Sequence, residues 1–265
     1  MAKIGFIGMG NMGYAILKGL LKEYGKEELL FTDANRERME SVTAETGVAH
    51  IEGNAALASK CEYLVLAVKP QYYQPVLQNI INVVSSRNII ISIAPGITID
   101  QLKEKLGIDM RIVRAMPNTP ALVGEGMTGV CYDPALYSDE EKATIASLFC
   151  SFGRMKLVEE RLINAVACAS GSSPAYVYLF IEALADSAVK YGLPRADAYE
   201  MAAQAVLGSA KMVLETGMHP GALKDNVCSP GGTTIAGVSA LEEYGFRNSI
   251  IKASDACYEK CGNIK

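Results

Sequence analysis

Three glycines near the start of the chain have a spacing that suits the binding of a dinucleotide. Gly8, Gly10 and Gly13 form a G-x-G-x-x-G pattern between an apolar run, residues 4–7, and a helical pattern of apolar residues. The first glycine permits a tight turn, the second lets a pyrophosphate approach the backbone, and the third lets the helix pack close to the strand. Free N–H groups at the helix start then face the phosphate. This context favours a dinucleotide site over a glycine-rich turn without a ligand.

An acidic residue stands about 20 residues after the glycine pattern, where a dinucleotide site has its ribose contact. Asp33 suits a hydrogen bond with the ribose 2′-hydroxyl of NAD, whereas Asn35 and Arg36 suit the 2′-phosphate of NADP. Asp33 is also a candidate N-cap for a helix over residues 35–46. Spacing alone leaves all three interpretations open.

Three further apolar runs end in turns that contain proline. These turns are Ala67-Val68-Lys69-Pro70, Ala94-Pro95-Gly96 and Met116-Pro117-Asn118-Thr119-Pro120. Ligands of open α/β sheets bind outside the carboxyl ends of the strands. We therefore interpret the turns as parts of a binding crevice, with Lys69 as a cation and with Pro70 and Asn118 among the coenzyme contacts. A surface lysine at a structural turn is the alternative.

A second loop of small residues, far along the chain, suits a small anion. Residues 229–234 read S-P-G-G-T-T and lead into a helical pattern from Thr234 onward. Gly231 and Gly232 expose backbone N–H groups, while Thr233 and Thr234 add hydroxyls. Together these groups suit a carboxylate. An ordinary capped helix start has the same composition, so composition alone does not decide.

The elements that must position these residues divide the chain into two parts. Up to residue 160, apolar runs typical of parallel strands covered on both faces alternate with helical patterns. We predict strands over residues 4–7, 29–33, 63–68, 88–94, 111–116, 129–132 and 155–158. We predict helices over residues 35–46, 74–84, 99–106 and 139–152, with Thr98 as the cap of the third.

From residue 162 onward the sequence predicts helices and no strand. The segment from Pro174 to Tyr191, with Ser173 as its expected N-cap, is apolar over most of its circumference. Such a helix must be buried, and a subunit interface can cover it. The predicted fold class is therefore α/β, with a dinucleotide-binding domain over residues 1–160 and an all-helical dimerisation and substrate-binding domain over residues 161–265.

Composition excludes several classes of partner. The 265 residues have a net charge of -4 and a pI of about 5.4 without a long basic run, so we expect no nucleic acid. The longest apolar stretch is interrupted by Glu182 and Asp186, so we expect no membrane span. Seven scattered cysteines and two histidines indicate reduced thiols and no metal site. With no signal-peptide pattern at the N-terminus, we expect a cytoplasmic protein.

The second loop also carries the most specific likeness to a known family. Residues 224–235, K-D-N-V-C-S-P-G-G-T-T-I, closely resemble the signature of pyrroline-5-carboxylate reductases. Further stretches are similar to that family in the same order, at residues 5–13, 67–70, 114–120, 170–176 and 208–212. The resemblance covers essentially the whole chain. The S-P-G-G-T-T motif is far more specific than the glycine pattern, which many dehydrogenases share.

The resemblance implies a Rossmann-type domain followed by a helical domain that interlocks into homodimers, which often assemble into decamers. It implies reduction of 1-pyrroline-5-carboxylate to L-proline by NADPH or NADH, the last step of proline biosynthesis. Coenzyme contacts are implied for Ile7, Gly8, Met9, Gly10, Asn11, Met12, Asn54, Ala67, Val68, Lys69, Pro95 and Asn226. The substrate carboxylate and ring nitrogen are implied to lie against Gly231, Gly232, Thr233 and Thr234, with Glu160 at the pocket border.

In this interpretation a hydride passes to the imine carbon, and no protein nucleophile or metal is required. Thr234 is the expected catalytic residue, because its hydroxyl can bond the ring nitrogen and relay a proton with the help of water or of a substrate that is already protonated. Asp33 stands where NADPH-preferring members of the family often have a small residue. Because Asn35 and Arg36 follow it, we still expect NADP(H) to be preferred over NAD(H).

Two other functions fit parts of the sequence. A 3-hydroxyacid-type dehydrogenase opens with the same G-F-I-G-M-G-N-M-G run, but it needs a lysine on the helix after the domain junction, where this chain has Lys190 only at the far end. A non-catalytic NAD(P)-binding regulator would bind the coenzyme without turnover. Such a protein has no need for a second small-anion loop, so we favour the reductase.

Overall fold

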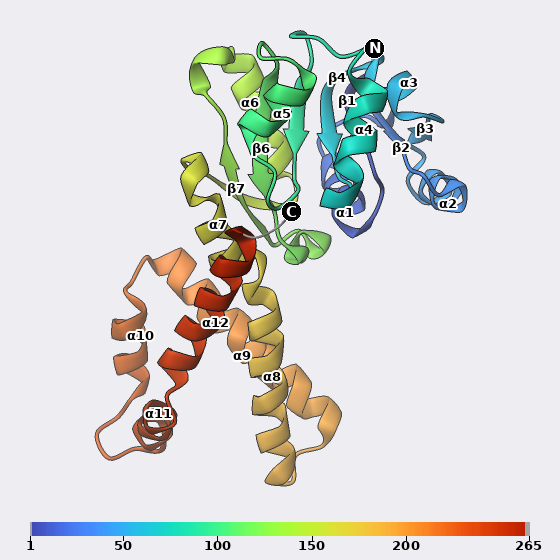
Figure 1. The fold of residues 1–265 in the computed structure, drawn as a ribbon. Coiled ribbons are helices and arrows are strands. Elements are labelled where there is room, and N and C mark those ends of the chain that lie inside the picture. The colour runs from blue at the N-terminus through green and yellow to red at the C-terminus, as the bar shows by residue number, and fades with distance from the viewer. Residues whose placement is uncertain (1, 263–265) are drawn as a thin grey trace. The chain divides into compact units, whose positions relative to one another are not determined.

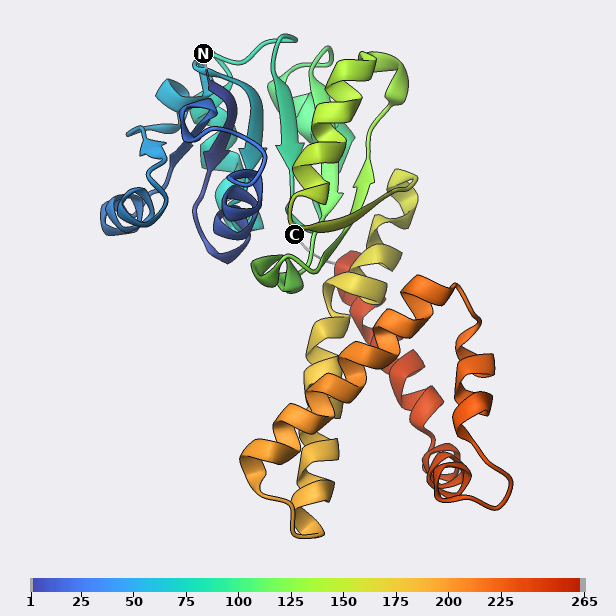
Figure 2. The ribbon, with the colours of Figure 1, turned by 180° about the vertical axis from the view of Figure 1, so that it is seen from behind.

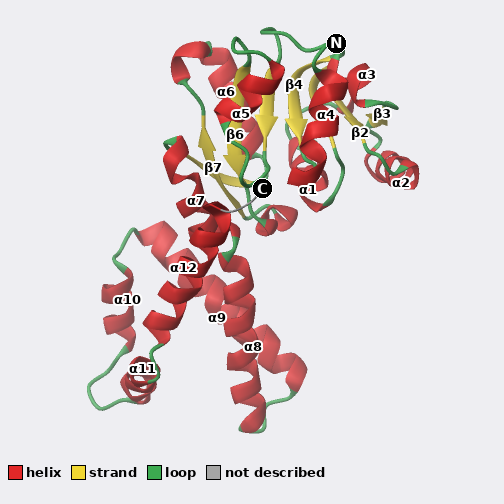
Figure 3. Ribbon diagram, viewed as in Figure 1, coloured by secondary structure: helices red, strands yellow, loops and turns green. Residues whose placement is uncertain are grey.

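The computed structural model describes residues 2–262 of the chain. Two compact units divide it: one runs up to Ser172 and takes in the chain again from Cys257, and the other runs from Ser173 to Ala256. Figure 1 shows the order of the elements, and Figure 3 shows that the strands belong to the first unit. The predicted order, an α/β part followed by an all-helical part, is confirmed.

The first unit is built on a sheet with the strand order β3-β2-β1-β4-β5-β6-β7-β8. All neighbouring strands pair in parallel except β6 and β7, which are antiparallel. The carboxyl ends of β1, β2, β4, β5 and β6 therefore meet at one edge of the sheet. The strand bounds are β1 Ala2–Ile7, β2 Leu29–Thr32, β3 Ala49–His50, β4 Cys61–Leu66, β5 Ile89–Ser92, β6 Arg111–Met116, β7 Gly126–Cys131 and β8 Gly153–Leu157.

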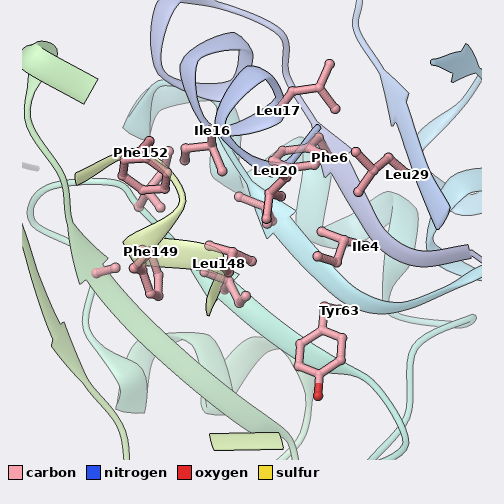
Figure 4. Packing of buried hydrophobic residues seen from close by; sticks show 14 of the residues in the cluster. Ile4, Phe6, Ile16, Leu17, Leu20, Leu29, Tyr63, Leu148, Phe149 and Phe152 are labelled. Carbon is pink, nitrogen blue, oxygen red and sulfur yellow. The ribbon is translucent and has the colours of Figure 1, made fainter. Parts of the chain in front are cut away.

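Helices cover both faces of this sheet, as the opposite views in Figures 1 and 2 show. One face carries α1 (Asn11–Leu20), α2 (Arg36–Thr46) and α6 (Asp139–Cys150), and the other carries α3 (Asn54–Ala58), α4 (Tyr73–Ile80) and α5 (Ile99–Leu106). Side chains alternate between the two faces along each strand. On β1, Ile4 and Phe6 belong to the core on the α1 side, and Ile7 belongs to the core on the α4 side. Figure 4 shows the first of these cores from nearby.

Local capping explains several element boundaries. Thr98 caps α5 through the N–H of Gln101, as predicted, and Ser138 caps α6 in the same way. The candidate capping role of Asp33 is wrong, because the side chain of Asn35 caps α2. The helix predicted over residues 74–84 ends at Ile80. Strand β3 and helix α3 were not predicted, because two and five residues are too short for a periodic apolar pattern.

The second unit consists of helices, like the C-terminal part predicted from sequence. Its elements are α8 (Ser173–Lys190), α9 (Arg195–Thr216), α10 (Pro220–Val227), α11 (Thr233–Glu243) and most of α12 (Phe246–Gly262). The predicted N-cap role of Ser173 is wrong, because Ser172 already has helical dihedral angles and Ser173 is the first residue of α8. The helical backbone arrives there from α7 (Ile163–Val166) through the π-helical turn Ala167–Gly171.

The second unit leaves most of its apolar side chains exposed. Ala185, Ala198 and Ala202 form its small buried cluster, where α8 and α9 pack together. Large apolar side chains elsewhere on these helices are exposed: Val177, Leu179, Phe180, Leu184, Met201, Leu207, Met212, Leu214, Leu241, Phe246, Ile250 and Ile251. Exposed apolar area on this scale is a mark of an interaction surface.

The boundary predicted between residues 160 and 161 lies inside the first compact unit. Helix α7 packs against β6 and β7, which keeps the chain with the sheet as far as Ser172. On its return the chain contacts the same place, since the Cys257 thiol lies 3.2 Å from the Ser172 hydroxyl. A junction of this kind follows from tertiary packing, which the sequence pattern does not reveal.

None of the seven cysteines, all of which the structure describes, forms a disulfide, and they differ greatly in burial. Cys61 and Cys131 are buried in the sheet, whereas Cys150 at the end of α6 is exposed. Within the described residues, no cluster of three or more His, Cys, Asp or Glu side chains is arranged to hold a metal ion. Over residues 2–262, none of the helices combines the length and the hydropathy that crossing a lipid bilayer requires.

The buried thiols are expected to resist alkylation. Burial raises the pKa of Cys61 to about 12 and that of Cys131 to about 11, so neither thiol forms the reactive thiolate near pH 8. Because ionisation favours the unfolded chain, stability should fall as the pH rises above the ordinary thiol pKa of about 8.5. Iodoacetamide labelling followed by mass spectrometry should find Cys150 modified first, and all seven cysteines modified in urea. Labelling of Cys61 at the rate of Cys150 in the folded protein would contradict this.

Candidate active site

The glycine loop after β1 combines two tight contacts with one open position. Gly8 has a φ of +98°, and a Cβ there would lie 2.7 Å from the carbonyl oxygen of Ala67. A Cβ at Gly13 would lie 2.3 Å from the carbonyl oxygen of Gly8. At Gly10, by contrast, no described residue other than its two neighbours in the chain has a heavy atom within 4 Å of the Cβ position. The fold therefore requires the first and third glycines, and the second keeps space open beside the backbone.

That open space lies at the start of α1, where an anion is favoured. Gly10 is the N-cap of α1 and has no side chain that could cap the helix. The first-turn N–H groups, which belong to Asn11, Met12 and Gly13, thus remain available, and the helix dipole adds a positive potential. The cradle fits the pyrophosphate of a dinucleotide. The side chains of Ile7 and Met9 are buried, so these two residues can contribute only backbone groups to the cradle.

Two residues of the β2–α2 segment bind the backbone N–H and C=O groups of Met9 in this loop. The Met9 N–H donates to Oδ2 of Asp33 over 2.6 Å, and the Asn35 N–H donates to the other carboxylate oxygen over 2.9 Å. At the next peptide, Nε of Arg38 donates to the Met9 carbonyl oxygen over 2.8 Å. Asp33 therefore stabilises the glycine loop in addition to any contact with a ribose. A role for Arg38 was not predicted from the sequence, although this residue lies only two positions after Arg36 in the segment that follows β2.

The next two strand ends are joined by a buried tyrosine. The hydroxyl of Tyr73 donates to the carbonyl oxygen of Leu66 over 2.9 Å and lies 3.0 Å from the Ser92 hydroxyl. Burial raises the pKa of this phenol. The side chain thereby links the end of β4 to the end of β5, beside the Ala67–Pro70 turn. Sequence reasoning missed Tyr73, because a tyrosine in the first turn of a helix has no distinctive pattern.

The Ala67–Pro70 turn, which follows β4, carries an exposed lysine, Lys69. Ala67 remains bonded to the first strand, through its N–H and the Ile7 carbonyl oxygen at 2.8 Å. Pro70 then begins a 3-10 helix, Pro70–Tyr72, with Lys69 as its N-cap. The Lys69 side chain is exposed, whereas Ala67, Val68 and Pro70 are half-buried. Lys69 is therefore free to reach an anion at the carboxyl edge of the sheet.

An ion pair between a buried arginine and a half-buried glutamate lies beside the loop that follows β5. Nη1 of Arg114 donates to Oε1 of Glu160 over 2.9 Å, and the same oxygen accepts the Ile99 N–H at the start of α5 over 2.8 Å. Arg114 is 4% exposed, and its Nε has no partner among the residues that the structure describes. Glu160 thus connects β6, α5 and the segment after β8. Its predicted place at the border of a substrate pocket stays a prediction.

The second anion loop has the geometry of an uncapped helix start. Gly231 has a φ of +68°, and Gly232 is the N-cap of α11 without a side chain to cap it. Thr233 and Thr234 occupy the first two helical positions and are exposed, and helix α11 thus begins one residue earlier than predicted. The hydroxyl of Thr234 and the first-turn N–H groups are available to a small carboxylate. Asn226 lies on α10 of the same unit and is exposed.

Comparison with known proteins gives these features a context. Residues 160–264 match the family model for pyrroline-5-carboxylate reductase dimerisation, and residues 3–96 match the model for NADP oxidoreductase, coenzyme F420-dependent. The pyrroline-5-carboxylate reductase of Escherichia coli (strain K12) is 48% identical over 260 residues, which cover 97% of this chain and 96% of that protein. The chain belongs to the pyrroline-5-carboxylate reductase family. The Methanosarcina acetivorans reductase is 41% identical over 263 residues, with 97% of each chain covered.

Solved structures of reductases in the family have the same fold. A crystal structure of the Plasmodium falciparum pyrroline carboxylate reductase with NADP bound matches with a TM-score of 0.88 at 35% identity, covering 99% of this chain and 97% of that chain. The Coxiella burnetii reductase matches with a TM-score of 0.92 at 34% identity, covering 99% and 98%. The resemblance that the sequence motifs indicated is therefore confirmed, and so is the predicted fold class.

The other predicted coenzyme contacts of this reductase have different surroundings. The amide of Asn118 is buried and occupied, because its oxygen accepts the Met127 N–H over 2.8 Å and its nitrogen donates to the Ser170 carbonyl oxygen over 3.0 Å. Asn54 begins α3 and is half-buried, as is Pro95 in the loop after β5. The coenzyme contacts of all three residues stay predictions, and the Asn118 side chain is already used to fix local structure.

Alanine at the third glycine should affect the stability of the fold, whereas alanine at the second should affect coenzyme binding. Gly13→Ala should lower the free energy of unfolding by about 1–3 kcal/mol, because its methyl group would overlap the Gly8 carbonyl. Gly10→Ala should change it by less than about 1 kcal/mol, yet weaken NADPH binding by at least about tenfold by filling the cradle. Urea unfolding followed by circular dichroism and titration of NADPH fluorescence measure the two effects. Normal NADPH binding by Gly10→Ala would show that the coenzyme lies elsewhere.

Removal of the Glu160 carboxylate should destabilise the fold. Glu160→Ala leaves the Arg114 guanidinium buried without a counter-ion, which should cost about 2–4 kcal/mol in the free energy of unfolding. Glu159→Ala is the matched control, since its partner Arg161 is exposed and such pairs contribute about 0–1 kcal/mol. Urea unfolding of both variants makes the comparison. Equal losses would mean that the Arg114–Glu160 pair is no stronger than a surface ion pair.

Proposed function

We propose that this chain is a pyrroline-5-carboxylate reductase that reduces the imine of 1-pyrroline-5-carboxylate to L-proline, the last step of proline biosynthesis. The observation that carries the proposal is the pair of anion cradles within a full-length family match. One cradle, at Gly10, accommodates a pyrophosphate. The other, at Gly231 to Thr234, accommodates a carboxylate and offers a hydroxyl. A reaction between a dinucleotide and a small carboxylated ring needs both.

The chemical step is a hydride transfer balanced by a proton. NAD(P)H, when bound, supplies a hydride from its nicotinamide ring. The hydride adds to the imine carbon. The ring nitrogen gains one proton, and the product is a secondary amine. The protein's own contribution is to orient the substrate and to place polar groups around it, because the coenzyme carries the difficult chemistry. Holding both reactants in a reactive geometry lowers the barrier by up to about 7–11 kcal/mol.

Thr234 is the polar group that we assign to the ring nitrogen. The Thr233 and Thr234 N–H groups, with that of Gly231, hold the carboxylate of the substrate, while the Gly232 N–H is bonded to the Ser229 carbonyl oxygen. This anchors the ring beside the Thr234 hydroxyl, which stabilises the nitrogen and passes a proton to it. A hydroxyl is a weak acid near neutral pH, so the proton comes through it from water or is already present on the substrate. The exposed position of Thr234 allows this access.

The coenzyme, the assembly and the compartment complete the proposal. NADP(H) is the preferred coenzyme, because cations follow β2 and because NADP is bound in the Plasmodium falciparum structure. The protein forms a homodimer through its helical unit, and dimers assemble into a decamer. The exposed apolar side chains of α8 and α9 support this assembly, and the matched dimerisation model covers the same segment. Seven cysteines without a disulfide among them support a reducing compartment, the cytoplasm.

The rate of coenzyme oxidation decides between this function and its rivals. Purified protein should oxidise NADPH when 1-pyrroline-5-carboxylate is added, with loss of the coenzyme absorbance and formation of proline. A parallel assay with NADH measures the coenzyme preference. If both coenzymes bind but neither is oxidised, the non-catalytic regulator becomes the better interpretation. If the protein instead reduces NADP⁺ when a 3-hydroxyacid is added, and does not reduce the imine, the dehydrogenase becomes the better interpretation.

Loss of the Thr234 hydroxyl should reduce turnover specifically. Thr234→Ala should lower kcat by about 100-fold, the lower end of what a positioned proton donor contributes, with NADPH binding nearly unchanged. Thr234→Ser keeps the hydroxyl and should retain most of the activity. Ser239→Ala, a hydroxyl loss at an exposed position on the same helix, is the matched control. Steady-state kinetics measure all three variants, and unchanged kcat in Thr234→Ala would remove this assignment.

A further inference from the structure

Two arginines follow β2, and their surroundings differ. Arg36 and Arg38 lie in the first turn of α2, within the segment where a dinucleotide-binding domain contacts the ribose of adenosine. An arginine at this place can hold the 2′-phosphate that distinguishes NADP from NAD. Only a guanidinium that is close to the glycine loop and has spare N–H groups can do so. The contacts of each arginine therefore decide between them.

Arg36 is already paired with carboxylates and points to solvent. Its Nε lies 3.1 Å from Glu40, and its Nη1 lies 3.8 Å from Glu52. Its side chain is 75% exposed. A phosphate that approached Arg36 would meet two carboxylates, which would repel it. Arg36, the residue that the sequence pattern favoured, is thus poorly placed for the 2′-phosphate.

Arg38 is held against the glycine loop from two sides. Its Nε donates to the Met9 carbonyl oxygen over 2.8 Å, and its guanidinium carbon lies 4.7 Å from the centre of the Tyr14 ring. The side chain is half-buried, so little conformational entropy remains to be lost on binding. With Nε engaged, both Nη groups have no hydrogen-bond partner among the residues that the structure describes. They form a donor pair of the kind that binds phosphate oxygens.

The ring under Arg38 is itself fixed. The Tyr14 hydroxyl hydrogen-bonds the carboxylate of Glu45, and this bond is the main cause that lowers the pKa of Glu45. Lys18 pairs with the same carboxylate over 3.6 Å, and its Nζ lies 5.4 Å from the centre of the ring. Glu45 is therefore bonded to Tyr14 and paired with Lys18. It attracts Arg38 only at longer range, without a salt bridge between the two among the described residues. The cation at the glycine loop keeps its charge available for a ligand.

We infer that Arg38, and not Arg36, binds the 2′-phosphate of NADP(H) and sets the preference of this protein for that coenzyme. Asp33 acts mainly as a brace in this arrangement, since both of its oxygens accept backbone N–H groups. The inference rests on the proposed function only through the coenzyme class. It is tested by nucleotide binding alone, which is independent of imine reduction.

The probes are adenosine 2′,5′-bisphosphate and adenosine 5′-phosphate, titrated by calorimetry into the full-length protein. Arg38→Gln should weaken binding of the bisphosphate by at least about tenfold and that of the monophosphate by less than about threefold, because one charge-assisted pair is lost. Arg38→Lys should give an intermediate loss, since it keeps the charge without the fork. Arg87→Gln, an exposed arginine in the loop before β5, is the control for loss of a surface charge and should change neither.

Other outcomes overturn the inference. Loss of bisphosphate binding in Arg36→Gln but not in Arg38→Gln would assign the phosphate to Arg36. Equal weakening of both probes by Arg38→Gln would mean that Arg38 only supports the Met9 peptide. Kinetics add a separate check, because kcat/KM for NADPH should fall relative to that for NADH in Arg38→Gln. If the binding pattern holds but the imine is not reduced by any form, the reductase proposal fails and the Arg38 assignment stands.

Discussion

The structure depends on a close backbone contact between the turn after β1 and the helix that follows it. The Cα of Gly13 packs against the Gly8 carbonyl so closely that a methyl group would lie 2.3 Å from it. This contact directs the start of α1 at the carboxyl edge of the sheet. Between the two glycines, the Met9 N–H is then bound by Asp33 and the Met9 carbonyl oxygen by Arg38. A rigid row of N–H groups results, which is what binding a pyrophosphate requires.

Periodic features of the chain were predictable from its sequence, and packing features were not. Strand β6 and helix α5 have the predicted bounds, because a mainly apolar run of strand length and a Thr98 capping box are local signals. Strand β3 is two residues long, and its place depends on pairing with β2. The tight turn and the close helix contact expected from the glycine spacing are present at Gly8 and Gly13, and the coenzyme contact stays a prediction. The part played by Arg38 was missed, because a contact to the Met9 carbonyl 29 residues away has no local signal.

The two units differ in how they satisfy their apolar side chains. The sheet of the first unit is covered on both faces, and a large cluster of buried apolar side chains lies on each face. The second unit has long helices with few buried positions, and α9 buries only Ala198 and Ala202 among its 22 residues. Apolar helices that find no partner within the unit need one from another chain. The all-helical segment is therefore expected to be stable as part of an assembly, which agrees with its match to a dimerisation model.

Several polar side chains at the carboxyl edge of the sheet already accept hydrogen bonds from backbone N–H groups. Strand ends and loops leave N–H groups that must be satisfied when they are buried. Asp33, Asn118 and Glu160 each accept such a group, which uses the side chains that a sequence pattern would assign to ligands. Among the described residues of this region, the donors that remain without a partner, and so could serve a ligand, include backbone amides and the side chains of Lys69 and Arg38. In this fold a polar residue at the right position is informative only once its existing hydrogen bonds are known.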